Sequence, residues 1–221
     1  LGKIRTVAKH HQQRLQDLDI LRNLIIADQT SPIKSPEMTV IGGMGGIGKT
    51  DLAAEFARQC YTRRAFPDGI VWFTVGNNPP NFSLVIDVSH ALGIKGIHER
   101  ELDIELRLRR YLNTHRCLII LDNVWDLHIA KSLHDLVVGS SCRVLITTRN
   151  RQIPLLLEVH EHELKEMTPE QSVTLLRDWV GHDDPSFLEI ARKVGYLPLA
   201  LKLAGARLCG GLSADEWLEK F

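Results

Sequence analysis

The chain has 221 residues, of which 44% are hydrophobic, and it carries 27 basic and 27 acidic side chains. This length and composition support a sizeable buried core and exclude a disordered chain. The balanced charge gives no overall field that attracts nucleic acid or an acidic membrane, and no stretch approaches the roughly 18 to 20 apolar residues of a membrane span. We therefore expect this chain to contact neither nucleic acid nor membrane.

Cysteine usage indicates a reducing compartment. Cys60, Cys117, Cys142 and Cys209 are far apart in the sequence and include no C-x-x-C pair, so we expect four reduced, buried thiols in a cytoplasmic protein. The chain begins at Leu1 with no signal peptide, and we expect it to be a fragment of a longer protein.

The first predicted elements lead to a glycine-rich loop. Apolar side chains recur at helical spacing from Leu15 to Ile25, and the prolines of the loop at 29–37 end that helix. The apolar run Met38 to Ile41 has the composition of a short buried strand. The glycine-rich loop follows this strand directly and precedes a predicted helix at about 49–60.

The loop reads GMGGIGKT from Gly43 to Thr50, which is a complete phosphate-binding P-loop. Its glycines let successive backbone N–H groups turn toward an anion, and the following helix directs its positive end at the phosphates. Lys49 would reach the β- and γ-phosphates, and the Thr50 hydroxyl would bind Mg²⁺. The predicted nucleotide contacts in this segment are Gly43, Gly45, Gly46, Ile47, Gly48, Lys49, Thr50 and Asp51.

Strands and helices alternate after the P-loop. Strands are predicted at 70–75, 117–121 and 143–148, with a loop at 76–81 and helices at about 83–92, 101–113 and 127–138. This alternation predicts an α/β fold, a three-layer P-loop NTPase with a parallel sheet and its ligand at the carboxyl ends of the strands.

Beyond residue 168 the pattern becomes purely helical. Helices are predicted at 169–180, 185–194, 198–209 and 214–221, with no strand between them. We therefore expect a nucleotide-binding domain over 1–155 and a small all-helical subdomain over 156–221.

Two further residues complete the candidate chemistry. Asp122 directly follows the apolar run at 117–121, where a P-loop protein needs a second acidic group for Mg²⁺. Thr50 and Asp122 are thus the predicted metal ligands. Arg149 ends the strand at 143–148, so its guanidinium would reach the same sheet edge and bind a γ-phosphate bidentately. Lys49, Asp122 and Arg149 are the candidate catalytic residues.

The residue after Asp122 points to slow chemistry. Many P-loop ATPases place a carboxylate there to activate water, whereas Asn123 is an amide that cannot accept a proton at neutral pH. No N-K-x-D or T-K-x-D guanine signature follows the P-loop, which favours adenine. ADP or ATP with Mg²⁺ is therefore the expected cofactor.

Other clusters carry weaker signals. Arg107, Arg109 and Arg110 lie in a helical pattern and fit a solvated helix face better than a binding patch. His160 and His162 would share one strand face, but without a third ligand nearby they fit exposed polar positions better than a metal site.

The order of motifs resembles that of NB-ARC domains, the nucleotide-binding switches of plant resistance proteins, the apoptotic protease-activating factor and bacterial STAND regulators. The matching segments are GMGGIGKT, FPDGIVWF (66–73), LIILDNVWD (118–126), RVLITTRN (143–150) and GYLPLALKLAG (195–205). The resemblance implies that Pro198 packs near the nucleotide, that Arg149 senses phosphate, and that Arg14 belongs to the segment that touches adenine. It also implies that 156–221 is an ARC subdomain, and that the winged-helix part of family members is absent.

These observations lead to an ADP/ATP-binding switch with at most slow Mg²⁺-dependent ATP hydrolysis. Its expected partners are an adenine nucleotide, other domains of the full-length protein and, on activation, further copies of itself. Two alternatives remain open at this point. One is a catalytic P-loop ATPase or kinase, and the other is a nucleotide-bound scaffold that never hydrolyses.

Overall fold

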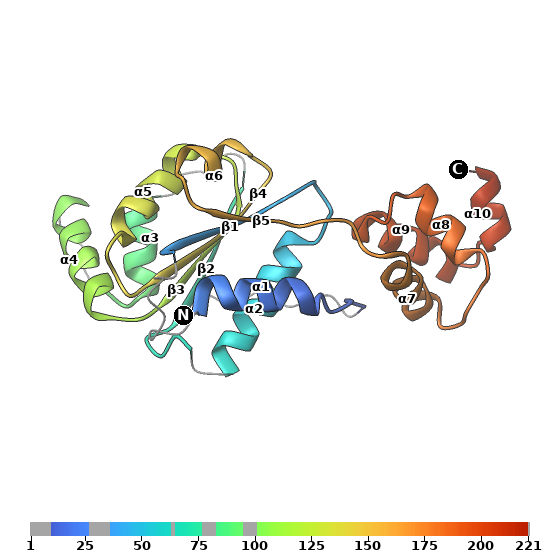
Figure 1. The fold of residues 1–221 in the computed structure, drawn as a ribbon, viewed down its shortest axis with the longest axis horizontal. Helices are drawn as coiled ribbons and strands as arrows, with labels where there is room; N and C mark the ends of the chain where they lie inside the picture. Colours follow the sequence, from blue (N-terminus) through green and yellow to red (C-terminus); the bar gives the residue numbers. More distant parts are fainter. Residues whose placement is uncertain (1–9, 27–35, 63–64, 77–82, 95–100, 221) are drawn as a thin grey trace. The chain divides into compact units, whose positions relative to one another are not determined.

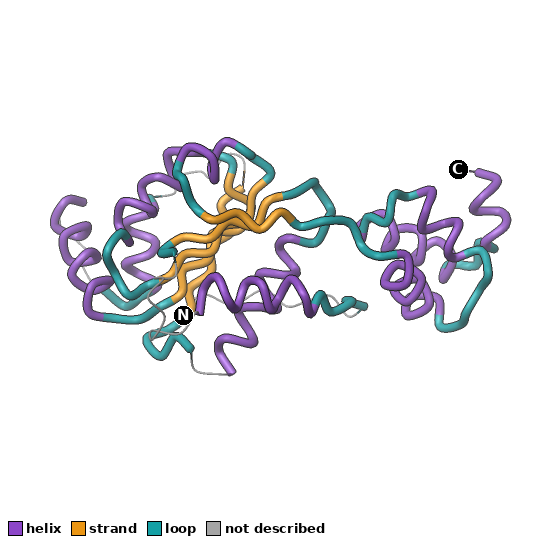
Figure 2. The backbone as a smooth tube through the Cα atoms, viewed as in Figure 1, coloured by secondary structure: helices purple, strands orange, loops and turns teal. Residues whose placement is uncertain are grey.

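A computed structural model describes residues 10–26, 36–62, 65–76, 83–94 and 101–220 (Figures 1 and 2). These residues fall into two compact units. The sheet unit contains Leu15–Gly42 and Lys49–Glu163, and the helical unit contains the segment that ends at Arg14, Gly43–Gly48 and Leu164–Phe221. The proline-containing loops predicted at 29–37 and 76–81 lie largely outside the described residues.

The sheet unit is built on five parallel strands in the order β2-β3-β4-β1-β5. The strands are β1 (Met38–Gly42), β2 (Ile70–Gly76), β3 (Leu118–Val124), β4 (Arg143–Thr148) and β5 (His160–Glu163). The β1 strand is buried at every position, as its continuous apolar composition predicts for a parallel strand covered on both faces. Because all strands run the same way, the P-loop after β1 lies at the edge where β3 and β4 also end.

Helices cover both faces of this sheet (Figure 1). One face carries α1 (Leu15–Ile26) and α2 (Lys49–Thr62), and the other carries α3 (Leu84–Ala91), α4 (Glu101–Thr114), α5 (Leu127–Val137) and α6 (Gln152–Leu156). The apolar stripes of these helices pack on the strands, so that Leu108, Leu133 and Ile119 belong to one buried cluster. This arrangement confirms the predicted three-layer P-loop NTPase fold.

The helical unit contains α7 (Pro169–Val180), α8 (Phe187–Lys193), α9 (Pro198–Cys209) and α10 (Ala214–Lys220). Local signals set the bounds of α7, because Thr168 and Gln171 form a capping box at its start and Gly181 adopts a left-handed conformation at its end. Leu175, Phe187 and Leu201 are fully buried among these helices and form a separate core.

The structure differs from the sequence-based expectations in three places. The short β5 strand, with sequence HEHE, pairs with β1, whereas the predicted elements include no strand between residues 149 and 168. The α6 helix was also not predicted. Cys60, Cys117 and Cys142 are buried thiols as expected, but the prediction for Cys209 was wrong, because it ends α9 on an exposed surface.

The structure also bears on membranes and metals. None of the helices in the described residues is long and apolar enough to cross a membrane. Within the same ranges, no group of three or more histidine, cysteine or acidic side chains is placed to hold a metal ion. His162 instead contacts Asp17 on α1, with 2.7 Å between Nε2 and Oδ1, while His160 is exposed.

Candidate functional site

The P-loop has the backbone conformation that its glycines permit. Gly43, Gly46 and Gly48 have φ angles of 132°, 78° and 104°, values that residues with a side chain rarely adopt. The loop begins where β1 ends at Gly42, and Lys49 starts α2. The predicted strand, loop and helix are therefore all present.

Within the helical unit, the P-loop glycines contact the start of α9. The Leu199 N–H donates to the Gly46 carbonyl at 3.2 Å, and a Cβ on Gly46 would lie 2.9 Å from the Leu199 Cβ. Pro198 comes within 4.0 Å of the Cβ position of Gly48. The α9 terminus is thus fitted to a loop without side chains at these two positions.

Arg14 supports the same loop from the N-terminal side. Its side chain is 7% exposed, and the guanidinium donates to the carbonyls of Ile47 at 3.3 Å and Lys165 at 2.6 Å. These bonds tie the P-loop to the segment that enters α7. The structure therefore gives Arg14 a role in fixing the loop backbone, while its predicted adenine contact stays a prediction.

Lys49 is buried at the start of α2 and has a strongly perturbed charge equilibrium. The pKa of Lys49 is lowered to about 8, because desolvation and, to a smaller extent, the positive charge of Arg149 disfavour the charged form, while Asp122 partly opposes the shift. The positive charges of Lys49 and Arg149 thus lie near each other, and Lys49 is partly desolvated. An anion between them would reduce their repulsion and stabilise the desolvated lysine charge.

Thr50 and Asp122 meet at the ends of α2 and β3. The Thr50 hydroxyl and the Thr147 hydroxyl both donate to Asp122 Oδ1, each at 2.7 Å. Asp122 is 2% exposed, so these donors satisfy a buried carboxylate. A hydroxyl and a carboxylate side by side are the oxygen ligands that Mg²⁺ prefers, so the predicted metal pair fits the ion. Asp51 lies in the first turn of α2 and is partly exposed.

A β-bulge follows Asp122. Leu121 pairs with Ile146 and Val124 with Thr148, so Asp122 and Asn123 both lie opposite Thr147. Asn123 has a φ of 61°, which asparagine tolerates better than most residues. Its N–H donates to Thr147 Oγ1 at 2.8 Å, and its side-chain oxygen accepts from Trp125 Nε1 at 3.1 Å. The amide that replaces a catalytic carboxylate is therefore held by hydrogen bonds.

Arg149 lies just after β4 beside Trp125. Its guanidinium carbon is 5.5 Å from the centroid of the Trp125 ring, within the range of a cation–π contact. The Asn150 side-chain amide donates to the Trp125 carbonyl at 3.0 Å, which connects the ends of β3 and β4. The structure thus brings Arg149 close enough to Lys49 to affect its charge, as the shared sheet edge predicts.

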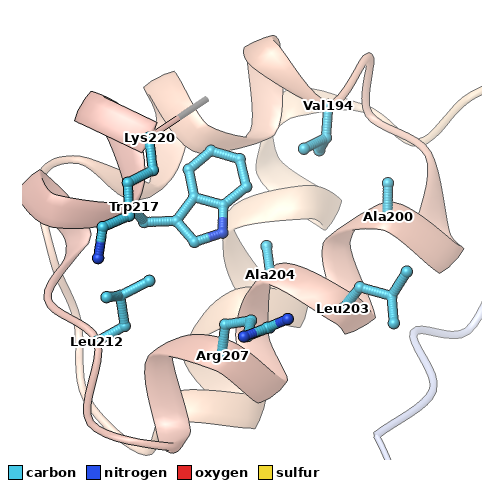
Figure 3. A pocket seen from close by; sticks show the side chains of 8 residues that line it. All are labelled: Val194, Ala200, Leu203, Ala204, Arg207, Leu212, Trp217 and Lys220. Atoms are coloured by element: carbon cyan, nitrogen blue, oxygen red, sulfur yellow. The ribbon is translucent and has the colours of Figure 1, made fainter.

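A separate cavity of about 430 Å³ lies in the helical unit (Figure 3). Figure 3 shows the Trp217 indole of α10 directed toward Ala204 of α9. Arg207 and Lys220 are its charged lining residues, and none of the sequence-predicted site residues takes part.

Comparison with protein families places these features in a known context. Residues 24–186 match the NB-ARC domain, which is more than half of the chain. The chain belongs to the NB-ARC family. Membership carries the nucleotide-binding module with it, and a bound nucleotide in P-loop proteins is typically accompanied by Mg²⁺.

Relatives of this NB-ARC chain occur in bacteria and plants. The regulatory protein AfsR of Streptomyces griseus is 31% identical over 183 residues, covering 77% of this chain and 18% of AfsR. A putative disease resistance protein of Arabidopsis thaliana is 28% identical over 215 residues, covering 87% of this chain and 25% of that protein. The chain therefore spans about a fifth to a quarter of the curated relatives it matches.

Solved structures show the same fold as this NB-ARC chain. A STAND protein with a tetratricopeptide-repeat sensor from Pyrococcus horikoshii aligns with a TM-score of 0.60 and 22% identity, covering 91% of this chain and 30% of its own. The Aeropyrum pernix ORC2 protein, solved as ADPNP–ADP complexes, aligns with a TM-score of 0.60 and 15% identity, covering 91% and 70%.

Sequence reasoning missed several residues around the NB-ARC site. Thr147 was seen only as part of a strand, although its hydroxyl contacts Asp122. Neither Trp125 nor Leu199 was predicted as a site residue. A hydroxyl at the carboxyl end of a strand beside the Asp122 strand was the available signal for Thr147. The contacts of Trp125 and Leu199 depend on packing that has no sequence pattern.

Proposed function

We propose that this chain is the switch module of a STAND-type signalling protein. It holds ADP in a resting form, exchanges it for ATP to change the state of the helical unit, and hydrolyses ATP slowly if at all. In this proposal Thr50 and Asp122 hold Mg²⁺, which neutralises phosphate charge. Gly43 to Asp51 surround the phosphates, Pro198 packs near the nucleotide, and Arg149 senses the γ-phosphate.

The Leu199–Gly46 hydrogen bond is the observation that carries the switch. The Gly46 carbonyl belongs to the phosphate-binding loop, and the Leu199 N–H belongs to the first turn of α9. A phosphate that reorganises the loop would alter this bond and the fit of Leu199 against Gly46. Within the helical unit, the loop contact thus offers a direct path from nucleotide state to α9.

Amide hydrogen exchange tests this path. We expect the amides of residues 197–201 to exchange at different rates with MgADP and with a non-hydrolysable ATP analogue. The reason is that the analogue places an additional phosphate against the loop. If both ligands bind tightly and the exchange rates are equal, the result would favour the alternative of a nucleotide-bound scaffold that does not switch. Turnover of many ATP per second would instead favour a catalytic ATPase.

Asn123 supports slow hydrolysis. Its amide cannot take a proton from water, and its oxygen already accepts the indole N–H of Trp125. The position after Asp122, where many P-loop ATPases have a carboxylate, therefore supplies no general base in this chain.

An Asn123→Asp variant should hydrolyse ATP faster. A carboxylate at this position would supply the missing base, and general-base catalysis contributes roughly 10²-fold or more. Aspartate also tolerates the positive φ of this bulge and keeps an acceptor for Trp125. Single-turnover hydrolysis of bound ATP, with Asn123→Ser as the matched control, measures the effect. An unchanged rate would show that the absent carboxylate does not limit hydrolysis.

The wider setting is also part of this proposal. The chain would act in the cytoplasm within a longer protein, whose other domains respond to the nucleotide state. Activated copies would associate with one another. Chromatography of the nucleotide released on denaturation is a direct first test, and retained ADP is the expected result.

A further inference from the structure

Trp125 contacts three parts of the site edge at once. Its indole N–H donates to the Asn123 side chain at 3.1 Å, and its backbone carbonyl accepts from the Asn150 amide at 3.0 Å. The face of its ring lies under the Arg149 guanidinium, with 5.5 Å from the guanidinium carbon to the centroid. The Asn123 bond holds the ring and the Asn150 bond holds the backbone of Trp125, at the ends of β3 and β4.

Arg149 needs a support of this kind. Its side chain is exposed and long, so it has many rotamers available in solvent. The electron-rich face of the Trp125 ring, 5.5 Å from the guanidinium carbon, attracts this cation and limits the rotamers of the guanidinium.

The bulge in β3 determines where the ring lies. Asn123 and Asp122 share one opposing residue, Thr147, and Asn123 turns through a left-handed conformation. This geometry leaves the Asp122 carboxylate bonded to Thr50, while the Asn123 oxygen bonds to Trp125. The metal ligand and the aromatic support are therefore set by the same irregularity of one strand.

We infer that Trp125 is a positioning residue for phosphate sensing, which holds the Arg149 guanidinium ready to bind the terminal phosphate of a nucleoside triphosphate. The inference rests on the proposed function of Arg149. Trp125 acts through Arg149 and touches no phosphate itself, so its loss should affect ATP binding and spare ADP binding.

Equilibrium binding of fluorescent ADP and of a fluorescent non-hydrolysable ATP analogue, in excess Mg²⁺, tests this role. Trp125→Leu should weaken binding of the ATP analogue by roughly three- to tenfold, the range of a cation–π contact of intermediate burial. Arg149→Gln should weaken it at least as much, because it also removes the guanidinium that would bind the phosphate. Binding of ADP should stay within about twofold of the unmodified chain, since neither residue would contact the two inner phosphates.

Two further variants separate positioning from packing. Trp125→Phe keeps a ring face and should retain most of the discrimination between the two nucleotides. The double variant Trp125→Leu with Arg149→Gln should bind the ATP analogue no worse than Arg149→Gln alone, because both changes remove one interaction.

The outcomes distinguish this inference from the proposed function. If Arg149→Gln binds both nucleotides normally, the sensor role in the proposed function fails. If Arg149→Gln loses discrimination but Trp125→Leu keeps it, the inference alone is wrong. Equal weakening of ADP and ATP analogue by Trp125→Leu would also overturn it, since that result indicates general damage to the fold.

Discussion

At the scale of single residues, we expect Lys49 to couple nucleotide binding to pH. The folded chain holds its pKa at about 8, below the ordinary value of 10.5, because burial and Arg149 disfavour its charge. Between these two values the unfolded chain binds more protons than the folded chain. The folded state is therefore penalised below pH 8, and its stability rises with pH across this window.

Phosphate binding should reverse the shift, because an anion beside Lys49 favours the charged form. We expect proton uptake on binding ADP, amounting to about half a proton near pH 8, and weaker binding as pH rises above that value. Titration calorimetry in two buffers of different ionisation enthalpy measures the uptake. A Lys49→Arg variant is the control, because arginine keeps its charge over this range, and equal uptake in both proteins would contradict the assignment.

At the scale of elements, the P-loop and α9 depend on each other through Gly46. This residue has a φ of 78°, and its Cβ position lies 2.9 Å from the Leu199 Cβ. The positive φ strains the backbone of any other residue at this position, whereas the short distance would bring its side chain against α9.

A Gly46→Ala substitution should therefore cost more than the backbone strain alone. Gly139 provides a matched control, because it also has a φ of 78° but no atom lies within 4 Å of its Cβ position. We expect Gly139→Ala to lower the free energy of unfolding by about 1 to 2 kcal/mol, and Gly46→Ala to lower it further and to weaken ADP binding. Urea denaturation and ADP titration measure both effects. Equal losses of stability in the two variants would show that Leu199 moves away from the added methyl group at no cost in free energy.

The element predictions succeeded where local patterns are strong. The apolar runs of β1, β3 and β4 and the helical periodicity of α2, α4 and α7 all match the structure. They failed at β5, whose polar HEHE sequence pairs through its backbone at the sheet edge, and at the bulge in β3. Strand pairing stabilises these features through partners that are distant in the sequence.

At the scale of the whole molecule, the P-loop sequence crosses the division between the two units. Gly43 to Gly48 belong to the helical unit, whereas Lys49 and Thr50 belong to the sheet unit. A nucleotide held by the full motif would therefore stabilise both units against unfolding. Cys209 is the exposed thiol on α9, and the other three cysteines are buried, so a dye on Cys209 reports on the helical unit.

Thermal unfolding tests this coupling. MgADP at about 100 times its dissociation constant should add roughly 2.7 kcal/mol to the free energy of unfolding. The Cys209 dye and the circular dichroism of the whole chain should both shift to higher temperature. Lys49→Ala should abolish both shifts, because the phosphates lose their buried cation. A shift in circular dichroism without a shift in the dye signal would contradict stabilisation of the helical unit.

The sequence alone determined the phosphate-binding loop, the parallel α/β architecture and the candidates Lys49, Thr50, Asp122 and Arg149, because these depend on short motifs and local periodicity. Only the tertiary structure decided that Arg14 bonds to the loop carbonyls, that Leu199 fits against Gly46, and that Trp125 supports Arg149. These contacts join residues on separate segments, and the packing of the folded chain alone brings such segments together. The GMGGIGKT motif thus predicts a phosphate site, while its neighbours in space determine how nucleotide occupancy would be sensed.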